Sequence, residues 1–130
     1  MRRIVLALAL AACAHAPPRP TAVDVVQRQL EAYNARDIDA FAATYADDVL
    51  VTMGGQVLVL GIDGLRERWG KNFAKYPNVR CRIAERKTEG DNVVIDHEII
   101  TGWPGKPDPW DVGWVRYVVR DGKIKSLEIP

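Results

Sequence analysis

His97 is the side chain in this sequence best suited to proton transfer near neutral pH. Residues 93–101 read as a strand, and alternation puts His97 on the same strand face as Val93, Ile95 and Ile99. We expect this face to line the interior, where an imidazole can serve as a catalytic acid–base group or bind a ligand. The alternative is a structural histidine that is hydrogen-bonded within a mixed core.

The other polar candidates point to structural roles. His15 is the only other histidine and lies near the N-terminus, so no histidine-based metal cluster is expected, and no cofactor either. Asp96 and Glu98 flank His97 on the opposite strand face, where we expect ion pairs with arginines of neighbouring strands. The candidate partners are Arg80, Arg82 and Arg116. Asp47 and Asp48 stand at a helix-to-strand junction, where carboxylates serve turns and caps.

Large side chains recur at positions that helix and strand periodicity direct inward. We predict that six of them form a ligand-binding lining: Tyr33, Tyr45, Met53, Trp69, Phe73 and Tyr117. The simpler interpretation is that they are only core. Trp103, Trp110 and Trp114 cluster around a proline-rich loop at residues 102–109, where they can form a pocket rim, a dimer contact or a membrane-facing patch.

Three helices must position these side chains. Thr21 and Asp24 have the spacing of a capping box at the start of the first helix. Asp37 can cap a short second helix and Asp63 a third, which Pro77 prevents from continuing. Apolar residues recur on one face of each, so the helices are expected to pack against a common partner.

Six strands are predicted to supply that partner. Residues 49–53 and 56–60 flank the turn at Gly54 and Gly55, and residues 79–87, 93–101, 110–120 and 123–129 form a meander. This order predicts one α+β domain at residues 21–130, a cone-shaped curved antiparallel sheet packed on three N-terminal helices. A sheet bent around helices leaves a conical cavity in which a small ligand can sit.

Several segments resemble the SnoaL-like proteins of the nuclear transport factor 2-like superfamily, which include the ketosteroid isomerases. They are residues 25–28, 34–39, 45–48, 61–65 with Trp69, 94–98 and 117–124, so the resemblance covers most of residues 24–129. It implies the cone-shaped fold and a possible homodimer through the outer sheet face. The family includes isomerases, cyclases, dehydratases and binding modules, so the fold does not define the activity.

The resemblance also permits a test of the isomerase chemistry. The isomerase tyrosine corresponds to Gln29, the aspartate base to Met53, and the carboxylic acid of the oxyanion hole to a position near Val115. A methionine cannot remove a proton and a valine cannot stabilise an oxyanion. The catalytic residues of the ketosteroid isomerases are therefore not matched.

The N-terminus predicts export. Residues 1–12 combine a basic start with an apolar run too short to span a bilayer, as in a signal peptide. Residues 10–13 resemble a bacterial lipobox, which implies lipidation of Cys13, and residues 13–20 then form a tether. The alternative is ordinary cleavage after Ala16 and a secreted soluble protein, but Pro17 directly after that site disfavours it.

Charge and cysteine content exclude other classes. Loss of residues 1–12 leaves 16 basic against 17 acidic residues, a net charge of −1, and no electrostatic basis for binding nucleic acid. Cys81 is then the only thiol in the folded part, so no intrachain disulfide is expected.

Together these features predict an exported lipoprotein facing the periplasm and anchored to the membrane through its N-terminal lipid. Its SnoaL-like domain is expected to bind a small apolar or aromatic molecule, with His97 and Tyr33 as polar contacts. Two alternatives stay open. One is an isomerase, cyclase or dehydratase with His97 as general acid–base, and the other is a non-catalytic protein-interaction module.

Overall fold

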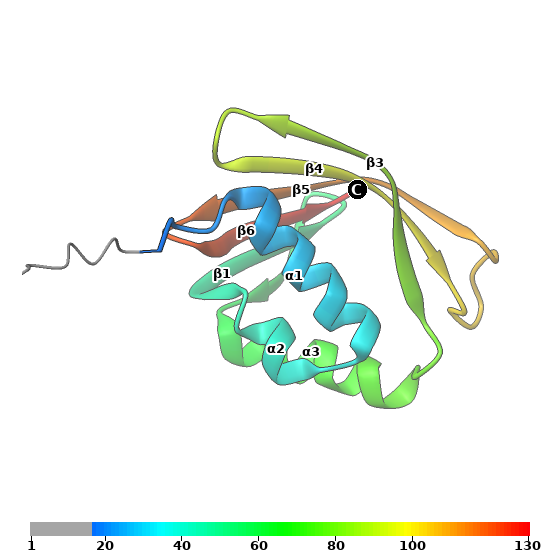
Figure 1. The fold of residues 1–130 in the computed structure, drawn as a ribbon. Helices are drawn as coiled ribbons and strands as arrows, with labels where there is room; N and C mark the ends of the chain where they lie inside the picture. Colours follow the sequence, from blue (N-terminus) through cyan, green and yellow to red (C-terminus); the bar gives the residue numbers. More distant parts are fainter. Residues whose placement is uncertain (1–16) are drawn as a thin grey trace, which may run out of the picture.

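The computed structural model describes residues 17–130, with three helices on one face of a six-stranded sheet (Figure 1). The helices are α1 (Ala22–Ala35), α2 (Ile38–Ala42) and α3 (Ile62–Lys75). The strands are β1 (Tyr45–Met53), β2 (Gln56–Leu60), β3 (Arg80–Glu89), β4 (Val93–Thr101), β5 (Trp110–Arg120) and β6 (Lys123–Ile129). The predicted α+β fold is confirmed.

The predicted signal peptide, Cys13 and the first residues of the tether lie outside the described residues. Within residues 17–130, no helix combines the length and the hydropathy that a bilayer span requires.

Two of the three predicted helix caps are present. Thr21 and Asp24 form a reciprocal capping box, with bonds of 3.1 and 2.9 Å, and Asp37 accepts a bond from a backbone N–H three residues on. The prediction for α3 is wrong, because Gly61 precedes this helix and Asp63 lies in its first turn. Gly61 has a φ of 88°, a conformation that favours glycine, and this lets β2 turn directly into α3.

The strand order is β2-β1-β6-β5-β4-β3. Strands β3 to β6 form the predicted antiparallel meander, but β1 runs parallel to β6, so the sheet is mixed and not wholly antiparallel. The two strands come from opposite ends of the domain, and no hairpin turn prescribes their relative direction. Tyr45 begins β1 and pairs with Ile124.

Two bulges bend the sheet around α1. On β3, Ile83 pairs with Glu98 and Glu85 with His97, which leaves Ala84 without a partner. On β5 the register also shifts beside Glu98. Glu98 pairs with Gly113, but the next residue of β4, Ile99, pairs with Asp111. Because a bulge bends its strand and increases the local twist, two bulges beside the same residue of β4 produce a sharp local curvature.

An aromatic core packs between the helices and the sheet. Phe41 has no exposed surface, and its ring centroid lies 5.0 Å from Tyr45, 5.3 Å from Phe73 and 5.9 Å from Trp69. Tyr33 extends this cluster from α1, with its centroid 5.5 Å from Phe73. These contacts join all three helices to β1.

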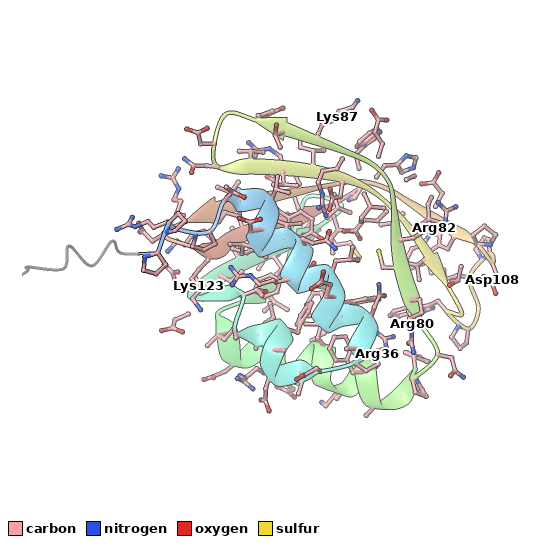
Figure 2. The ribbon with its side chains drawn as sticks, viewed as in Figure 1. Arg36, Arg80, Arg82, Lys87, Asp108 and Lys123 are labelled. Carbon is pink, nitrogen blue, oxygen red and sulfur yellow. The ribbon has the colours of Figure 1, made fainter. Side chains whose placement is uncertain are left out.

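Polar contacts hold the C-terminal end of α1 against β3 and the end of α3. The Asn34 amide donates to the carbonyl oxygen of Cys81 and accepts from its backbone N–H, both at 2.8 Å. Arg36, labelled in Figure 2, donates to the carbonyl of Tyr76 at 2.8 Å and lies over the ring of Phe73 at 4.8 Å. These contacts therefore fix the C-terminal end of α1 to β3 and to the residue that follows α3.

Candidate functional site

A cavity of about 240 Å³ lies between α1, α3 and the concave face of the sheet. Four of the six predicted ligand-binding residues line it: Tyr33, Met53, Trp69 and Tyr117. Tyr45 and Phe73 are not among the lining residues and instead pack in the aromatic core. The remaining lining comes mostly from apolar side chains of α1, β2, β4, β5 and β6: Leu30, Leu58, Ile100, Val112, Val115, Leu127 and Ile129.

Aromatic side chains form one wall of the cavity. The centroid of Tyr76, which follows α3, lies 5.0 Å from that of Trp103, and Trp110 lies 6.1 Å further on. Both tryptophans are half-buried and line the cavity, as a pocket rim would. Trp114 does not join them, because it projects from the outer face of β5, where Lys87, labelled in Figure 2, lies over its ring at 4.2 Å.

Glu98 is the carboxylate that lines this cavity, although the sequence suggested that it faces outward. The interior face of β4 carries Val94, Asp96 and Ile100 as well as Glu98, with Val94 at 0% and Asp96 at 1% exposure. The predicted orientation of the strand was wrong because both faces of β4 are rich in apolar residues. Alternation alone therefore cannot tell which face meets α1.

The environment of Glu98 favours its protonated form. Burial raises the pKa of Glu98 to about 7, and the negative charge of Asp96 adds to this effect. Hydrogen bonds from Tyr117 and Cys81, and the charge of Arg86, act in the opposite direction but are outweighed. The Tyr117 hydroxyl donates to Glu98 Oε1 at 2.5 Å. The group can therefore gain or lose a proton near neutral pH, which acid–base chemistry requires.

The neighbouring polar groups are arranged to remain neutral. Burial raises the pKa of Tyr33 to about 12 and that of Tyr117 well above its usual range. Burial also raises the pKa of the Cys81 thiol, with the charge of Glu98 as the next cause. Gln29, which also lines the cavity, donates to the Tyr45 hydroxyl at 3.0 Å. These groups supply hydrogen bonds rather than charge.

His97 lies on the outer face of the sheet, so the prediction that it faces the interior was wrong. It is not among the residues that line the cavity, and its Nε2 lies 2.8 Å from Asp111 Oδ1. Trp114 is its partner across the strands, with the two rings 5.0 Å apart. Its catalytic role stays a prediction, and this location does not connect it to the cavity.

Asp96 makes a structural ion pair, but with an arginine other than the three predicted. Asp96 accepts a bidentate pair of bonds from Arg86, at 2.7 and 2.8 Å, on the interior face. Arg86 also donates to Gln27 of α1 at 3.0 Å, so this pair ties β3 and β4 to the helix. Asp48 pairs with Lys125 at the surface.

The positions that correspond to the isomerase catalytic residues all lie at the cavity. Gln29, Met53 and Val115 line it together. The resemblance therefore pointed to the same cavity as the candidate site, and Gln29, Met53 and Val115 differ from the isomerase catalytic residues. Within residues 17–130, no three His, Cys, Asp or Glu side chains are grouped as metal ligands would be.

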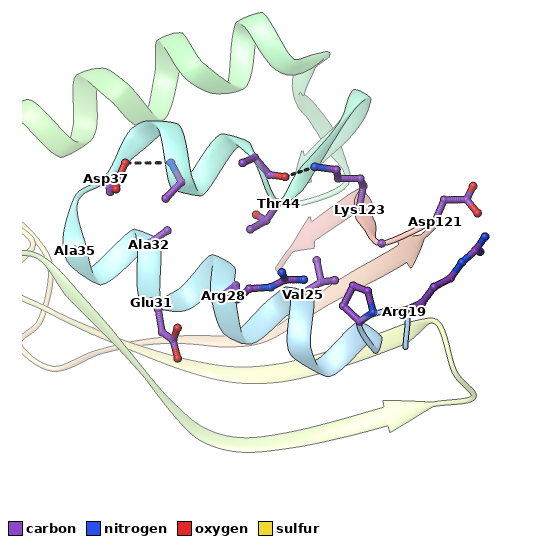
Figure 3. Close-up of a pocket in the computed structure, with 14 residues that line it drawn as sticks. Arg19, Val25, Arg28, Glu31, Ala32, Ala35, Asp37, Thr44, Asp121 and Lys123 are labelled. Atoms are coloured by element: carbon purple, nitrogen blue, oxygen red, sulfur yellow. Dashed lines mark hydrogen bonds between the residues drawn. The ribbon is translucent and has the colours of Figure 1, made fainter. Parts of the chain in front are cut away.

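A wider groove of about 960 Å³ runs between α1, α2 and the β5–β6 turn (Figure 3). Every ionisable side chain that lines it is exposed, among them Arg28, Glu31 and Asp121. Lys123 donates to the carbonyl of Ala43 across the groove. The smaller cavity has an apolar lining with a few polar groups directed into it, as small-molecule sites do, so we place the candidate site there.

Comparison with known proteins agrees with this architecture. A family model described as the SnoaL-like domain matches residues 26–127. An uncharacterized cystatin-fold protein from Novosphingobium aromaticivorans is 26% identical, with a TM-score of 0.74 over 85% of this chain and 97% of that one. No curated protein sequence matches the chain.

Two more distant structures share the fold alone. A candidate polyketide cyclase from Sinorhizobium meliloti is 23% identical, with a TM-score of 0.70 over 82% of this chain and 94% of that one. A protein with a ketosteroid isomerase-like fold from Catenulispora acidiphila, solved in complex with trimethylamine, is 19% identical. Its TM-score is 0.68, over 87% of this chain and 86% of that one.

Proposed function

The chain belongs to the SnoaL-like domain family, and we propose that its cone binds a small apolar or aromatic molecule. One observation carries this proposal: a cavity of about 240 Å³ encloses the carboxyl group of Glu98 among aromatic and aliphatic side chains. An apolar lining with a few convergent polar groups is typical of small-molecule sites. Since a cavity of about 150 Å³ accommodates benzene, this one has room for a single ring with short substituents.

Glu98 and Tyr117 take the place of His97 as the proposed polar contacts, with Tyr33 beside them. A protonated Glu98 can donate a hydrogen bond to a carbonyl or hydroxyl oxygen of the ligand, whereas ionised Glu98 can accept one. With its pKa raised to about 7, Glu98 can do either near neutral pH. The ligand is therefore expected to carry a neutral polar group on an apolar body.

A second candidate function is acid–base catalysis of the isomerase, cyclase or dehydratase kind, with Glu98 as the acid–base group. The arrangement that favours it is the Glu98 carboxyl, which lines the cavity beside the Tyr117 hydroxyl and whose pKa burial raises to about 7, close to the pH at which general bases are most effective. The Glu98 carboxylate would take a proton from a carbon beside a carbonyl, and the electron pair of the broken C–H bond would form an enolate. The resulting carboxylic acid would return the proton to another carbon. The candidate polyketide cyclase among the similar structures is consistent with such chemistry.

Export and lipidation of Cys13 remain proposals that rest on the sequence motif, with a secreted soluble protein as the alternative. Incorporation of labelled palmitate into the wild-type protein, and its loss in Cys13→Ser, would test them. Homodimerisation through the outer sheet face likewise rests on the family resemblance. The interaction-module alternative is less favoured, because Trp103 and Trp110 turn toward the cavity and do not form one exposed patch with Trp114.

Native mass spectrometry of the full chain, purified from its source, tests the binding proposal. We expect a retained small molecule that denaturation releases. Val115→Phe should displace it by filling the cavity, whereas Val118→Phe, a half-buried valine on the other face of β5, should retain it. A wild-type chain without any bound molecule, or equal retention by both variants, would contradict the proposal.

Single-turnover assays with the retained molecule separate a binding protein from an enzyme. If the molecule is transformed, Glu98→Gln should abolish turnover and keep binding, because the amide preserves the shape but cannot exchange a proton. His97→Ala should keep turnover, since His97 lies outside the cavity. Loss of turnover in His97→Ala alone would instead support the role predicted from the sequence.

A further inference from the structure

Helix α3 and the residue that follows it form one side of the cavity mouth. Arg68, Asn72 and Tyr76 occur at intervals of four residues and all line the cavity. Residues four apart lie on the same face of a helix, so the three side chains form one row. Trp103 contacts Tyr76 and continues the rim on the side of the sheet.

Arg68 has no acidic partner among residues 17–130, unlike Arg66 and Lys71 on the same helix. Arg66 pairs with Asp39 at 2.8 Å, and Lys71 pairs with Glu67 at 3.0 Å. Among residues 17–130, no side chain or carbonyl forms an ion pair or hydrogen bond with the guanidinium of Arg68. The helix therefore presents an uncompensated cation to the mouth of an otherwise apolar cavity.

The two charged residues that line the cavity lie at different depths. Arg68 is exposed to solvent, whereas Glu98 is half-buried on the interior face of β4, where the buried Tyr117 hydroxyl donates to it. A ligand anion beside Glu98 would meet a second acidic group, and a ligand cation at the mouth would meet Arg68. The favourable orientation therefore places an anionic group at the mouth and a neutral body inside.

On the basis of the proposed function, we infer that the ligand is a one-ring aromatic carboxylate, with its ring in the cone and its carboxylate bound by Arg68 and Asn72. The guanidinium can donate two parallel hydrogen bonds to a carboxylate. The Asn72 amide, one helical turn on, can donate a third. Trp69 and Trp103 line the cavity and can contact the aromatic body. The cavity volume has room for a ring with a short acidic arm, and Arg68 lines the same cavity.

Calorimetric titration of the full chain at pH 6 with 3-phenylpropanoate and 3-phenylpropanamide tests this inference. The two probes have the same ring and arm and differ only in the charge of the terminal group. We expect the carboxylate to bind at least about tenfold more tightly, because hydrogen bonds to charged groups are the stronger ones. Arg68→Gln should remove this preference, because glutamine carries no charge with which to favour the carboxylate over the amide. Arg66→Gln, on the same helix but paired with Asp39, should behave as the wild type.

The outcomes separate this inference from the proposed function. Equal binding of the two probes, or a carboxylate preference that persists in Arg68→Gln, would overturn the inference alone and leave a ligand cavity in place. Failure of both probes to bind would count against the proposed function as well. Raising the salt concentration should weaken binding of the carboxylate and not of the amide, and the opposite result would also overturn the assignment.

Discussion

Replacement of Glu98 by glutamine removes a carboxyl group whose ionisation opposes folding. Burial raises the pKa of Glu98 from 4.5 to about 7, so the folded chain holds this proton more tightly than the unfolded chain. Between these two pH values the unfolded chain has lost the proton while the folded chain keeps it. The free energy of unfolding therefore falls as the pH rises. Glutamine has the same shape and can still accept the bond from Tyr117.

The size of the effect follows from the two pKa values. From pH 5 to pH 8, this group should lower the free energy of unfolding of the wild type by about 2.5 kcal/mol. The full loss in the free energy of unfolding, from well below pH 4.5 to well above pH 7, would be about 3.4 kcal/mol. Glu98→Gln lacks this loss, so its stability relative to the wild type should rise by about 2.5 kcal/mol between the two pH values.

Urea unfolding monitored by tryptophan fluorescence at pH 5 and pH 8 measures this difference. Glu85→Gln is a matched control, because Glu85 lies on β3 with a side chain that is 58% exposed. The control should follow the pH dependence of the wild type. If Glu98→Gln does the same, solvent reaches Glu98 in the folded state, and the reasoning from an enclosed cavity is refuted.

Two further substitutions test the supports of the site. Asp96→Ala leaves Arg86 unpaired on the interior face, so it should lower the free energy of unfolding in urea by about 3–5 kcal/mol. Asp48→Ala removes a surface pair and should change the urea midpoint little. Equal effects of the two substitutions would contradict this account. Gly102→Ala places a Cβ 2.8 Å from a backbone carbonyl at a φ of 78°. It should cost about 1–3 kcal/mol and alter tryptophan fluorescence. Gly105→Ala, with no atom within 4 Å of the new Cβ, should cost less, and the reverse order would refute the close contact.

Local patterns in the sequence predicted most of the elements because their causes are local. The capping box at Thr21 and the cap at Asp37 act within a few residues, and the turn at Asp121 and Gly122 directs β5 into β6. The aromatic residues predicted to line the interior are all in the cavity or in the core beside it. The cap of α3 was missed because Gly61 allows a backbone turn without a side-chain bond.

The location of the candidate site depended on both sources. The resemblance to SnoaL-like proteins identified positions such as Gln29 and Met53 that line the cavity. It could not identify Glu98, because that residue matches none of the isomerase catalytic positions. A signal was present in the alternation of Glu98 with Val94 and Ile100, but His97 alternates with apolar residues equally well.

By itself, the sequence determined the helices, the meander and the family, since caps, turns and periodicity depend on neighbours along the chain. Only the tertiary structure decided that β1 joins β6 in parallel and that Glu98, not His97, faces the cavity. The physical reason is the same for both. The pairing of distant strands, and the choice of the face of β4 that meets α1, depend on contacts between segments that no local pattern relates.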